Sequence, residues 1–82
     1  MDNEMLRNRY REDIAEYFSR RRKASRLSQK DLAELTGMAP ANISRFESGS
    51  YNPSLDMMVR IADAMGMRLE IRLVKQKKEE KY

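Results

Sequence analysis

The sequence contains no cysteine, no histidine and no tryptophan among its 82 residues. Without cysteine, no disulfide can stabilise the fold and no thiolate zinc site can form. Without histidine, the usual general base of catalysis and the commonest metal ligand are both missing. An enzyme would need paired carboxylates in a cleft, yet the acidic residues fall at predicted helix surfaces and caps. We therefore expect a protein that is no enzyme and that holds no metal and no cofactor.

Glycine and long apolar runs are scarce as well. The chain has three glycines, and each ends a predicted helix rather than forming a loop that cradles phosphate. No apolar run approaches the ~20 residues that a membrane-spanning helix needs. The opening stretch, MDNEMLRNRY, is too polar for a signal peptide. We expect a cytoplasmic protein with no membrane partner.

The chain is short and basic. A length of 82 residues predicts one domain, and a domain this small is only marginally stable alone. Lysine and arginine number 17 against 13 acidic residues, and the net charge is +4. A basic balance favours nucleic acid or an anionic surface as partner. The alternative is a well-solvated domain whose charge has no functional meaning.

One long helix is predicted at the start of the chain, over residues 3–26. This stretch contains no glycine and no proline. Its apolar residues recur at three- and four-residue steps, which forms one amphipathic face. The face comprises Leu6, Tyr10, Ile14, Phe18 and the stem of Arg21.

Three shorter helices follow, and each begins at a favoured capping or first-turn residue. Serine is a good N-cap, proline fits a first turn because its missing N–H costs nothing there, and glycine suits the left-handed conformation that ends a helix. By these signals the helices span residues 29–36 after Ser28, 40–48 from Pro40, and 55–65 after Ser54.

The apolar period changes after the last of these helices. In the stretch MRLEIRLV, every second residue is apolar and charged residues stand between, which predicts a half-buried strand over residues 68–74. Its apolar residues are Leu69, Ile71 and Leu73. Residues 75–82 are charged and almost free of apolar side chains, so we expect a disordered tail.

The predicted strand has no partner within its own chain, because no other stretch has the pattern of a strand. A lone strand leaves amides unpaired and apolar side chains exposed. We therefore expect a homodimer whose two strands pair antiparallel about a two-fold axis, with the three apolar residues at the interface. Glu70 of one copy would then face Arg68 or Arg72 of the other. The alternative is that the stretch packs back on the helices of its own chain.

The second and third predicted helices flank a turn of a few residues at Gly37. So short a turn forces a steep crossing, and such a unit can place its second helix in a DNA major groove. At about 100° per residue, Ile43, Phe46 and Glu47 fall on one side of that helix. The opposite side carries small residues around one arginine, namely Ala41, Ser44, Arg45 and Ser48, flanked by Pro40 and Asn42.

Small side chains let a helix sit deep in a groove, and one arginine can then contact guanine O6 and N7 together. The alternative is an ordinary solvated helix face. A protein-interaction module that has lost DNA binding is also consistent with so plain a surface.

The stretch from Leu27 to Gly66 resembles a known family. The matching pieces are LSQ, LA, TG, IS followed by FE and G, and PSL followed by RIADAMG. Together they resemble the helix-turn-helix core of the phage-repressor and Cro family, also called the xenobiotic-response-element (XRE) family, over about residues 12–67. The resemblance implies a mostly α, lambda-repressor-like bundle of mostly five helices; here four are predicted, and the strand replaces the fifth. We expect a DNA-binding domain over residues 1–67, a dimerisation strand over 68–74 and the tail over 75–82.

The resemblance also implies DNA contacts by position. Base contacts are implied for Gln29, Pro40, Ala41, Ser44 and Arg45. Phosphate contacts are implied for Arg22, Ser28, Asn42, Ser48, Ser50, Tyr51 and Asn52. Pro40 and Ala41 depart from the polar residues often found at their positions, and they offer only apolar contacts, for instance to a thymine methyl.

Glu47 falls on the buried side of its helix. The family pairs this glutamate with an arginine of the first helix, and Arg22 stands at the matching position. Since a buried charge needs a partner, we predict an Arg22–Glu47 ion pair, with Arg22 near enough to the DNA backbone to help seat a phosphate.

These features together predict a sequence-specific regulator of transcription that binds double-stranded DNA, most simply a dimeric repressor. The alternative is the antitoxin of a toxin–antitoxin pair, which represses its own promoter and binds a toxin protein through residues 1–11 or through the tail.

Overall fold

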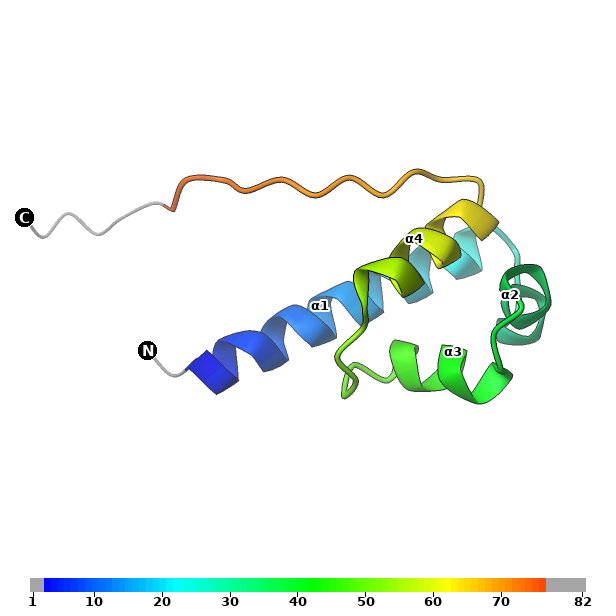
Figure 1. Cartoon of the computed structure of the whole chain (residues 1–82), viewed down its shortest axis with the longest axis horizontal. Coiled ribbons are helices and arrows are strands. Elements are labelled where there is room, and N and C mark those ends of the chain that lie inside the picture. The colour runs from blue at the N-terminus through cyan, green and yellow to red at the C-terminus, as the bar shows by residue number, and fades with distance from the viewer. Residues whose placement is uncertain (1–2, 77–82) are drawn as a thin grey trace, which may run out of the picture.

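The computed structural model describes residues 3–76, and within them the chain folds as four helices (Figure 1). They are α1 (Asn3–Ala24), α2 (Gln29–Thr36), α3 (Pro40–Glu47) and α4 (Leu55–Ala64). Each predicted helix is present, and no end differs from its prediction by more than two residues. In the part of the chain that the structure describes, no helix combines the length and the apolar character that crossing a membrane requires.

The ends of α2 are fixed by local chemistry that the sequence carries. Ser28 and Asp31 form a reciprocal cap, in which the Asp31 N–H donates to Ser28 Oγ and the Ser28 N–H donates to the Asp31 carboxylate, each at 2.9 Å. Gly37 ends the helix at a φ of 74°, which glycine adopts without steric cost. The two caps limit α2 to eight residues and begin the turn toward α3.

The end of α1 has the same form without a glycine. The Leu27 N–H donates to the Arg22 carbonyl at 3.2 Å, and the Arg26 N–H donates to the Lys23 carbonyl at 2.9 Å. This pair of bonds is the Schellman motif, whose left-handed position is usually glycine. Arg26 occupies that position at a φ of 61°, so the backbone there is strained.

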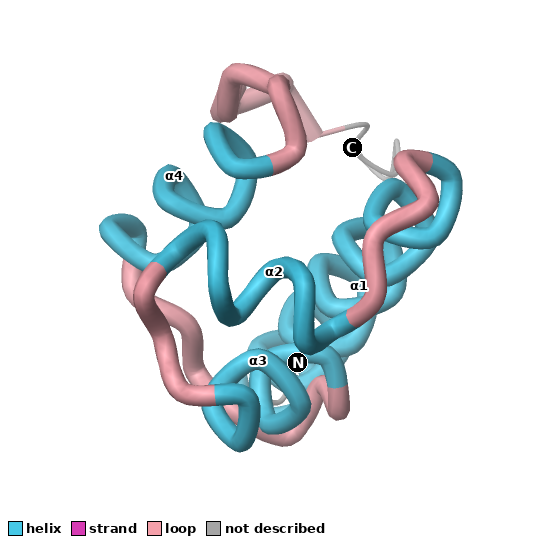
Figure 2. The backbone as a smooth tube through the Cα atoms, turned by 90° about the vertical axis from the view of Figure 1, so that its right-hand side faces the viewer, coloured by secondary structure: helices cyan, strands magenta, loops and turns pink. Residues whose placement is uncertain are grey.

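One hydrophobic core joins the four helices. Its buried residues are Phe18 of α1, Leu32 and Ala33 of α2, Ile43 and Phe46 of α3, and Met57, Ile61 and Ala62 of α4. The Phe18 and Phe46 rings meet edge to face with their centroids 5.0 Å apart, an arrangement that aromatic rings favour. Helix α2 packs against both α3 and α4, and α3 also packs against α1 (Figure 2).

Only part of α1 contributes to this core. Ala15 and Phe18 are buried and Ile14 packs against the core, whereas Tyr10 is 59% exposed and Arg21 is exposed. The buried residues of α1 therefore lie in its second half, from Ala15 to Arg22. The first turns stay mostly exposed because, at 1.5 Å per residue, the 22 residues of α1 extend beyond the shorter helices that cover them.

The loop after α3 touches the middle of α1. Gly49 is buried and has a φ of 82°. A Cβ placed on it would lie 3.4 Å from Glu12 Cα and 3.8 Å from Ala15 Cβ. Glycine serves here for its backbone angle, whereas a Cβ would make only ordinary van der Waals contact with α1.

The strand predicted over residues 68–74 is not formed within the described residues. The segment is extended and runs back beside α1 and α4 (Figure 1), but no hydrogen bond joins residues 68–76 to another described residue. A strand requires a ladder of backbone bonds to a neighbour, and residues 3–76 of a single chain supply none at this place. The prediction of a strand is thus wrong for the single chain, although the extended conformation is present.

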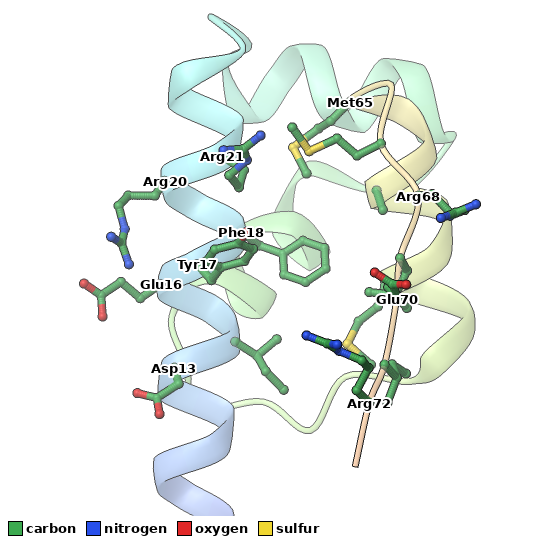
Figure 3. A pocket seen from close by; sticks show the side chains of 16 residues that line it. Asp13, Glu16, Tyr17, Phe18, Arg20, Arg21, Met65, Arg68, Glu70 and Arg72 are labelled. Atoms are coloured by element: carbon green, nitrogen blue, oxygen red, sulfur yellow. The ribbon is translucent and has the colours of Figure 1, made fainter. Parts of the chain in front are cut away.

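An open groove of about 880 Å³ lies between α1, α4 and this segment (Figure 3). Phe18 of α1 lies in the groove, and Arg68 and Leu69 of the segment also line it. The alternative that the stretch packs back on its own helices holds for Leu69, which packs against the core. It does not hold further on, because Ile71 is 65% exposed and Leu73 is 100% exposed.

Of the tail that was predicted to be disordered, the first two residues, 75 and 76, are exposed and have no regular structure. Residues 77–82 lie outside the described residues, and so does their part of the prediction.

Candidate nucleic-acid interface

Helix α3 presents one buried and one exposed face at an edge of the bundle (Figures 1 and 2). On the inner face, Ile43 is 0% exposed and Phe46 is 2% exposed. The residues of α3 predicted to contact bases are all exposed, namely Pro40, Ala41, Ser44 and Arg45. The helical arithmetic therefore placed both faces correctly.

Arg45 has two side-chain neighbours on this surface. Its Nη1 donates to Asn42 Oδ1 at 3.2 Å, and its guanidinium lies over the ring of Tyr51, 5.9 Å from the ring centroid. Asn42 and Tyr51 were both predicted to contact phosphates. In the free protein they contact Arg45, a role that the sequence did not reveal.

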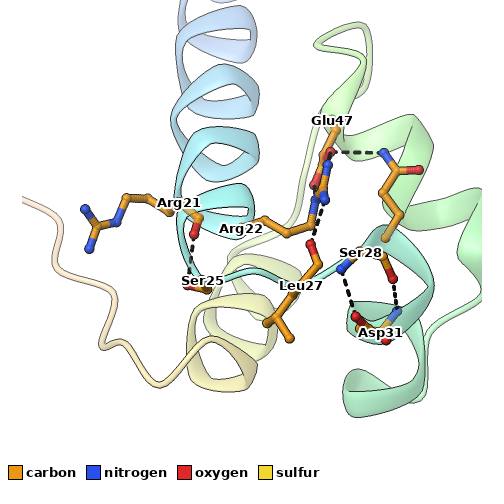
Figure 4. Close-up of polar contacts among 8 residues, drawn as sticks. Arg21, Arg22, Ser25, Leu27, Ser28, Asp31 and Glu47 are labelled. Atoms are coloured by element: carbon orange, nitrogen blue, oxygen red, sulfur yellow. Dashed lines mark hydrogen bonds and ion pairs between the residues drawn. The ribbon is translucent and has the colours of Figure 1, made fainter.

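The inner side of α3 is tied to α1 by the predicted ion pair (Figure 4). Arg22 Nε donates to Glu47 Oε2 at 2.7 Å, and Arg22 Nη2 donates to Glu47 Oε1 at 3.0 Å. This bidentate geometry is among the stronger ion-pair geometries in proteins. The two side chains are only 10% and 6% exposed. Arg22 Nη1 also donates to the Leu27 carbonyl at 2.8 Å, so one guanidinium joins α1, α3 and the loop before α2.

These contacts set the charge states of the pair. Burial by itself raises the pKa of the Glu47 carboxyl, but the hydrogen bonds from Arg22 and Gln29 and the charge of Arg22 together outweigh burial and lower that pKa. The hydrogen bond to Glu47 raises the pKa of Arg22 against the opposing effect of burial. Both groups are therefore charged at neutral pH, and the salt bridge is intact there.

Gln29 is joined to the same carboxylate. Its Nε2 donates to Glu47 Oε1 at 3.0 Å (Figure 4), and the side chain is half-buried at the start of α2. Its carbonyl oxygen makes no hydrogen bond to another described residue, so that atom stays available to a ligand. The hydrogen bonds among Arg22, Glu47 and Gln29 thus fix the position of Gln29, which is one of the predicted base contacts.

Ser28 stands beside Gln29 and is exposed, but both its hydroxyl and its backbone N–H are used in the cap with Asp31. The hydrogen bonds from the Ser28 backbone and hydroxyl lower the pKa of the Asp31 carboxyl. The start of α2 therefore carries a negative charge close to the site predicted for a phosphate.

The remaining predicted phosphate contacts lie in the turn after α3. Ser48, Ser50 and Asn52 are all exposed there. The Ser48 and Ser50 hydroxyl oxygens are 2.9 Å apart, and the Ser48 hydroxyl donates to the Arg45 carbonyl at 2.6 Å. These contacts tighten the turn directly behind the exposed face of α3.

The structure separates the predicted dimerisation residues from this surface. The extended segment that carries Leu69, Ile71 and Leu73 lies on the side of α1 and α4 away from α3 (Figure 1). A molecule bound to α3 and a molecule bound to the segment would therefore meet different faces of the bundle.

Sequence reasoning did not find the contacts of Arg45 with Asn42 and Tyr51 or the contact of Gln29 with Glu47. The three-residue spacing of Asn42 and Arg45 was a usable signal, because residues three apart are neighbours on a helix surface. The approach of Tyr51 to Arg45 had no such signal, since it depends on the path of the turn between them. The same holds for Gln29 and Glu47, which come together only when α2 crosses α3.

Comparison with known proteins agrees with this geometry. The helix-turn-helix family model matches residues 19–71, a stretch that contains α2, α3 and α4 whole. Over 44 residues, 54% of this chain, the sequence is 39% identical to an uncharacterized HTH-type transcriptional regulator of Methanocaldococcus jannaschii, and the match covers 67% of that protein. The chain therefore belongs to the helix-turn-helix family of the XRE and Cro type, and it carries that family's DNA-binding domain.

Proposed function

We propose that this protein regulates transcription by binding specific double-stranded DNA sequences as a dimer, and that it represses by occupying a promoter. The observation that carries the proposal is the two-sidedness of α3. Its inner face is buried and tied through Glu47 to α1 and α2, while its outer face is exposed. A helix whose inner face is fixed to the bundle and whose outer face is exposed can enter a major groove as a rigid unit. The name of the M. jannaschii protein supports the same role.

Within this proposal, Arg45 supplies the main base contact. Its guanidinium can donate two parallel hydrogen bonds to guanine O6 and N7. Pro40 and Ala41 add little bulk, so the helix can approach the bases closely, and the Ser44 hydroxyl can donate or accept. Gln29 adds a contact from the neighbouring helix through its free carbonyl oxygen.

The proposed phosphate contacts lie around this reading face. Asn42 is on α3 itself, Ser28 precedes α2, and the turn after α3 supplies Ser48, Ser50 and Asn52. Every nitrogen of Arg22 already donates to the protein. We propose that Arg22 serves phosphate binding mainly by holding Glu47 and Gln29 in place.

The test begins with selection of bound sequences from a random DNA pool, followed by gel retardation with the selected duplex and a scrambled one. We expect Arg45→Ala to remove the preference for the selected duplex while weak binding to both remains, because phosphate contacts carry no sequence information. Arg9→Ala removes the same charge from an exposed position early in α1 and serves as the matched control. An unchanged preference in Arg45→Ala would remove Arg45 from the reading role.

We infer that two copies assemble through their extended segments. Ile71 and Leu73 are exposed in the single chain, and the backbone from residue 68 to 76 has no hydrogen-bond partner among the described residues. If Ile71 lies on the two-fold axis of an antiparallel pair, Glu70 faces Arg72 of the other copy. In that register Leu69 faces Leu73, and each pair occurs twice. Facing opposite charges and facing apolar residues both stabilise paired strands.

Such a dimer leaves both copies of α3 open, because the segment lies on another side of the bundle (Figure 1). Two reading helices would then address two half-sites about 34 Å apart on a near-palindromic operator. The antitoxin function stays a prediction, since no described contact bears on a toxin partner.

A further inference from the structure

Arg45 is held by two neighbouring side chains before any ligand binds. Its Nη1 donates to Asn42 Oδ1 at 3.2 Å, and its guanidinium carbon lies 5.9 Å from the centroid of the Tyr51 ring. A cation within about 6 Å of an aromatic centroid is attracted to the electrons on the ring face. The two contacts therefore restrict a side chain that is otherwise exposed and flexible.

The Tyr51 ring offers a firm surface for this contact. It is half-buried and packs against the edge of the hydrophobic core. The turn that carries it is tightened as well, because the Ser50 N–H donates to Ser48 Oγ at 3.3 Å. The core and the turn thus fix the ring, and the ring in turn restrains Arg45.

The contact with Tyr51 leaves the guanidinium able to recognise a base. An aromatic ring attracts the cation without using its N–H donors in conventional hydrogen bonds. Asn42 accepts from Nη1, and neither Nε nor Nη2 of Arg45 donates to another described residue. Bidentate recognition of guanine needs two such donors. Arg45 is therefore ordered without losing the donors that recognition requires.

We propose that Tyr51 is a positioning residue for base readout. Its ring holds Arg45 in the orientation that contacts bases, and it contributes to sequence selectivity without touching a base itself. This inference rests on the proposed DNA-reading role of Arg45. It assigns to Tyr51 a role that depends on its ring, whereas the phosphate contact predicted from the sequence depends on its hydroxyl.

Two substitutions separate the ring from the hydroxyl. Tyr51→Phe removes only the hydroxyl, and Tyr51→Leu removes the ring while keeping an apolar side chain against the core. The measurement is the ratio of affinities for the selected duplex and for a scrambled duplex. We expect Tyr51→Leu to lower this ratio about threefold and Tyr51→Phe to leave it unchanged. If Tyr51→Phe weakens binding to both duplexes and Tyr51→Leu does no more than that, the hydroxyl is the active group and the proposal is overturned.

A double-mutant cycle tests whether the ring acts through Arg45. In an Arg45→Ala background, Tyr51→Leu should leave the remaining affinity for the selected duplex unchanged, because the group that the ring positions is absent. A further threefold fall of that affinity would show that the ring acts on binding by another route, and it would overturn the proposal. Thermal unfolding of each variant establishes that the fold is intact.

An NMR measurement tests the contact in the absence of DNA. The side-chain protons of Arg45 above the ring should be shifted upfield in the wild-type protein and should lose that shift in Tyr51→Leu. Absence of the shift in the wild type overturns the inference. Selective binding that is equal in the wild type and in Tyr51→Leu overturns only the inference, whereas a wild type with no sequence preference overturns the proposed function with it.

Discussion

Two regions of the molecule differ in how their polar and apolar groups find partners. One is the region around α2 and α3, and the other is the extended segment after α4. In the first region, Glu47 accepts from Arg22 and Gln29, and the caps and turns are hydrogen-bonded within the chain. In the second, the backbone of residues 68–76 and the Leu73 side chain find no partner among the described residues. The contrast teaches that one copy of the chain suffices to satisfy the polar groups of the α2–α3 region, whereas the groups of the segment are left open, as the proposed dimer requires.

The largest effect is expected from removing the internal partner of Arg22. Glu47→Ala leaves a guanidinium whose side chain is 10% exposed without its carboxylate, and we expect the free energy of unfolding to fall by about 3 kcal/mol. Urea denaturation followed by circular dichroism measures the change. Glu34→Ala, on the exposed side of α2, is the control and should shift the free energy by less than about 0.5 kcal/mol. Equal losses of unfolding free energy in the two variants would contradict the claim that the buried Arg22–Glu47 pair stabilises the region around α2 and α3.

The second effect concerns the extended segment and should appear in assembly. Glu70→Arg and Arg72→Glu each place like charges opposite one another in the proposed register, so each variant should dimerise about tenfold more weakly than the wild type. Sedimentation equilibrium measures the dissociation constants.

A mixture of those two variants provides the sharper part of the test. At positions 70 and 72, the Glu70→Arg copy carries two arginines and the Arg72→Glu copy carries two glutamates. In the proposed register each of these arginines faces one of these glutamates, so a heterodimer should form about as tightly as the wild-type dimer. Lys75→Glu reverses a charge outside the pairs described and is the control. A wild type that stays monomeric at every concentration, or a mixture that fails to recover, would contradict the register.

A smaller effect is expected from acidification. The pKa of Glu47 is lower in the folded protein than its ordinary value of 4.5, so the unfolded chain takes up the proton first as the pH falls. The stabilisation by Glu47 is therefore complete above about pH 4.5 and is lost as the pH falls through the folded pKa. Unfolding curves between about pH 6 and pH 3 should converge for the wild type and Glu47→Gln. Curves that stay parallel over this range would show that Glu47 does not cause the loss.

The smallest effect is expected at a strained position within the internally bonded region. Arg26 holds a φ of 61° at the end of α1, a conformation that costs most residues free energy and glycine almost none. Arg26→Gly should raise the free energy of unfolding by up to about 1 kcal/mol. Arg26→Ala removes the same side chain without relieving the backbone, and it should not be stabilising. Equal stabilities of the two variants would mean that the strain is negligible.

Most of the fold was predictable because its signals are local. Ser28, Gly37 and Pro40 each act on the backbone next to them, so the bounds of α2 and of the start of α3 follow from the residues themselves. The Arg22–Glu47 ion pair was also predictable, since the arithmetic buries Glu47 and the family resemblance points to Arg22. Burial of a charge then requires the contact.

What could not be predicted depends on distant segments. The approach of Arg45 to the Tyr51 ring depends on the path of the turn, and the hydrogen bond from Gln29 to Glu47 depends on the crossing of two helices. The strand failed for a different reason. Alternating residues such as Leu69 and Ile71 predict an extended backbone correctly, but the ladder that makes a strand belongs to two segments, and only the first of them is present among the residues that the structure describes.

The positive φ of Gly49 and its position against α1 limit which residues can replace this glycine during evolution. At Gly37 an added Cβ would meet nothing within 4 Å, so asparagine, which tolerates the same backbone angle, is an acceptable replacement there. At Gly49 the Cβ alone would already reach van der Waals contact with Glu12, and a longer side chain would push the end of α3 away from α1. We expect a saturation library to recover several residues at position 37 and glycine alone at position 49. Homologues should then keep the orientation of α3 against α1 because position 49 carries no side chain.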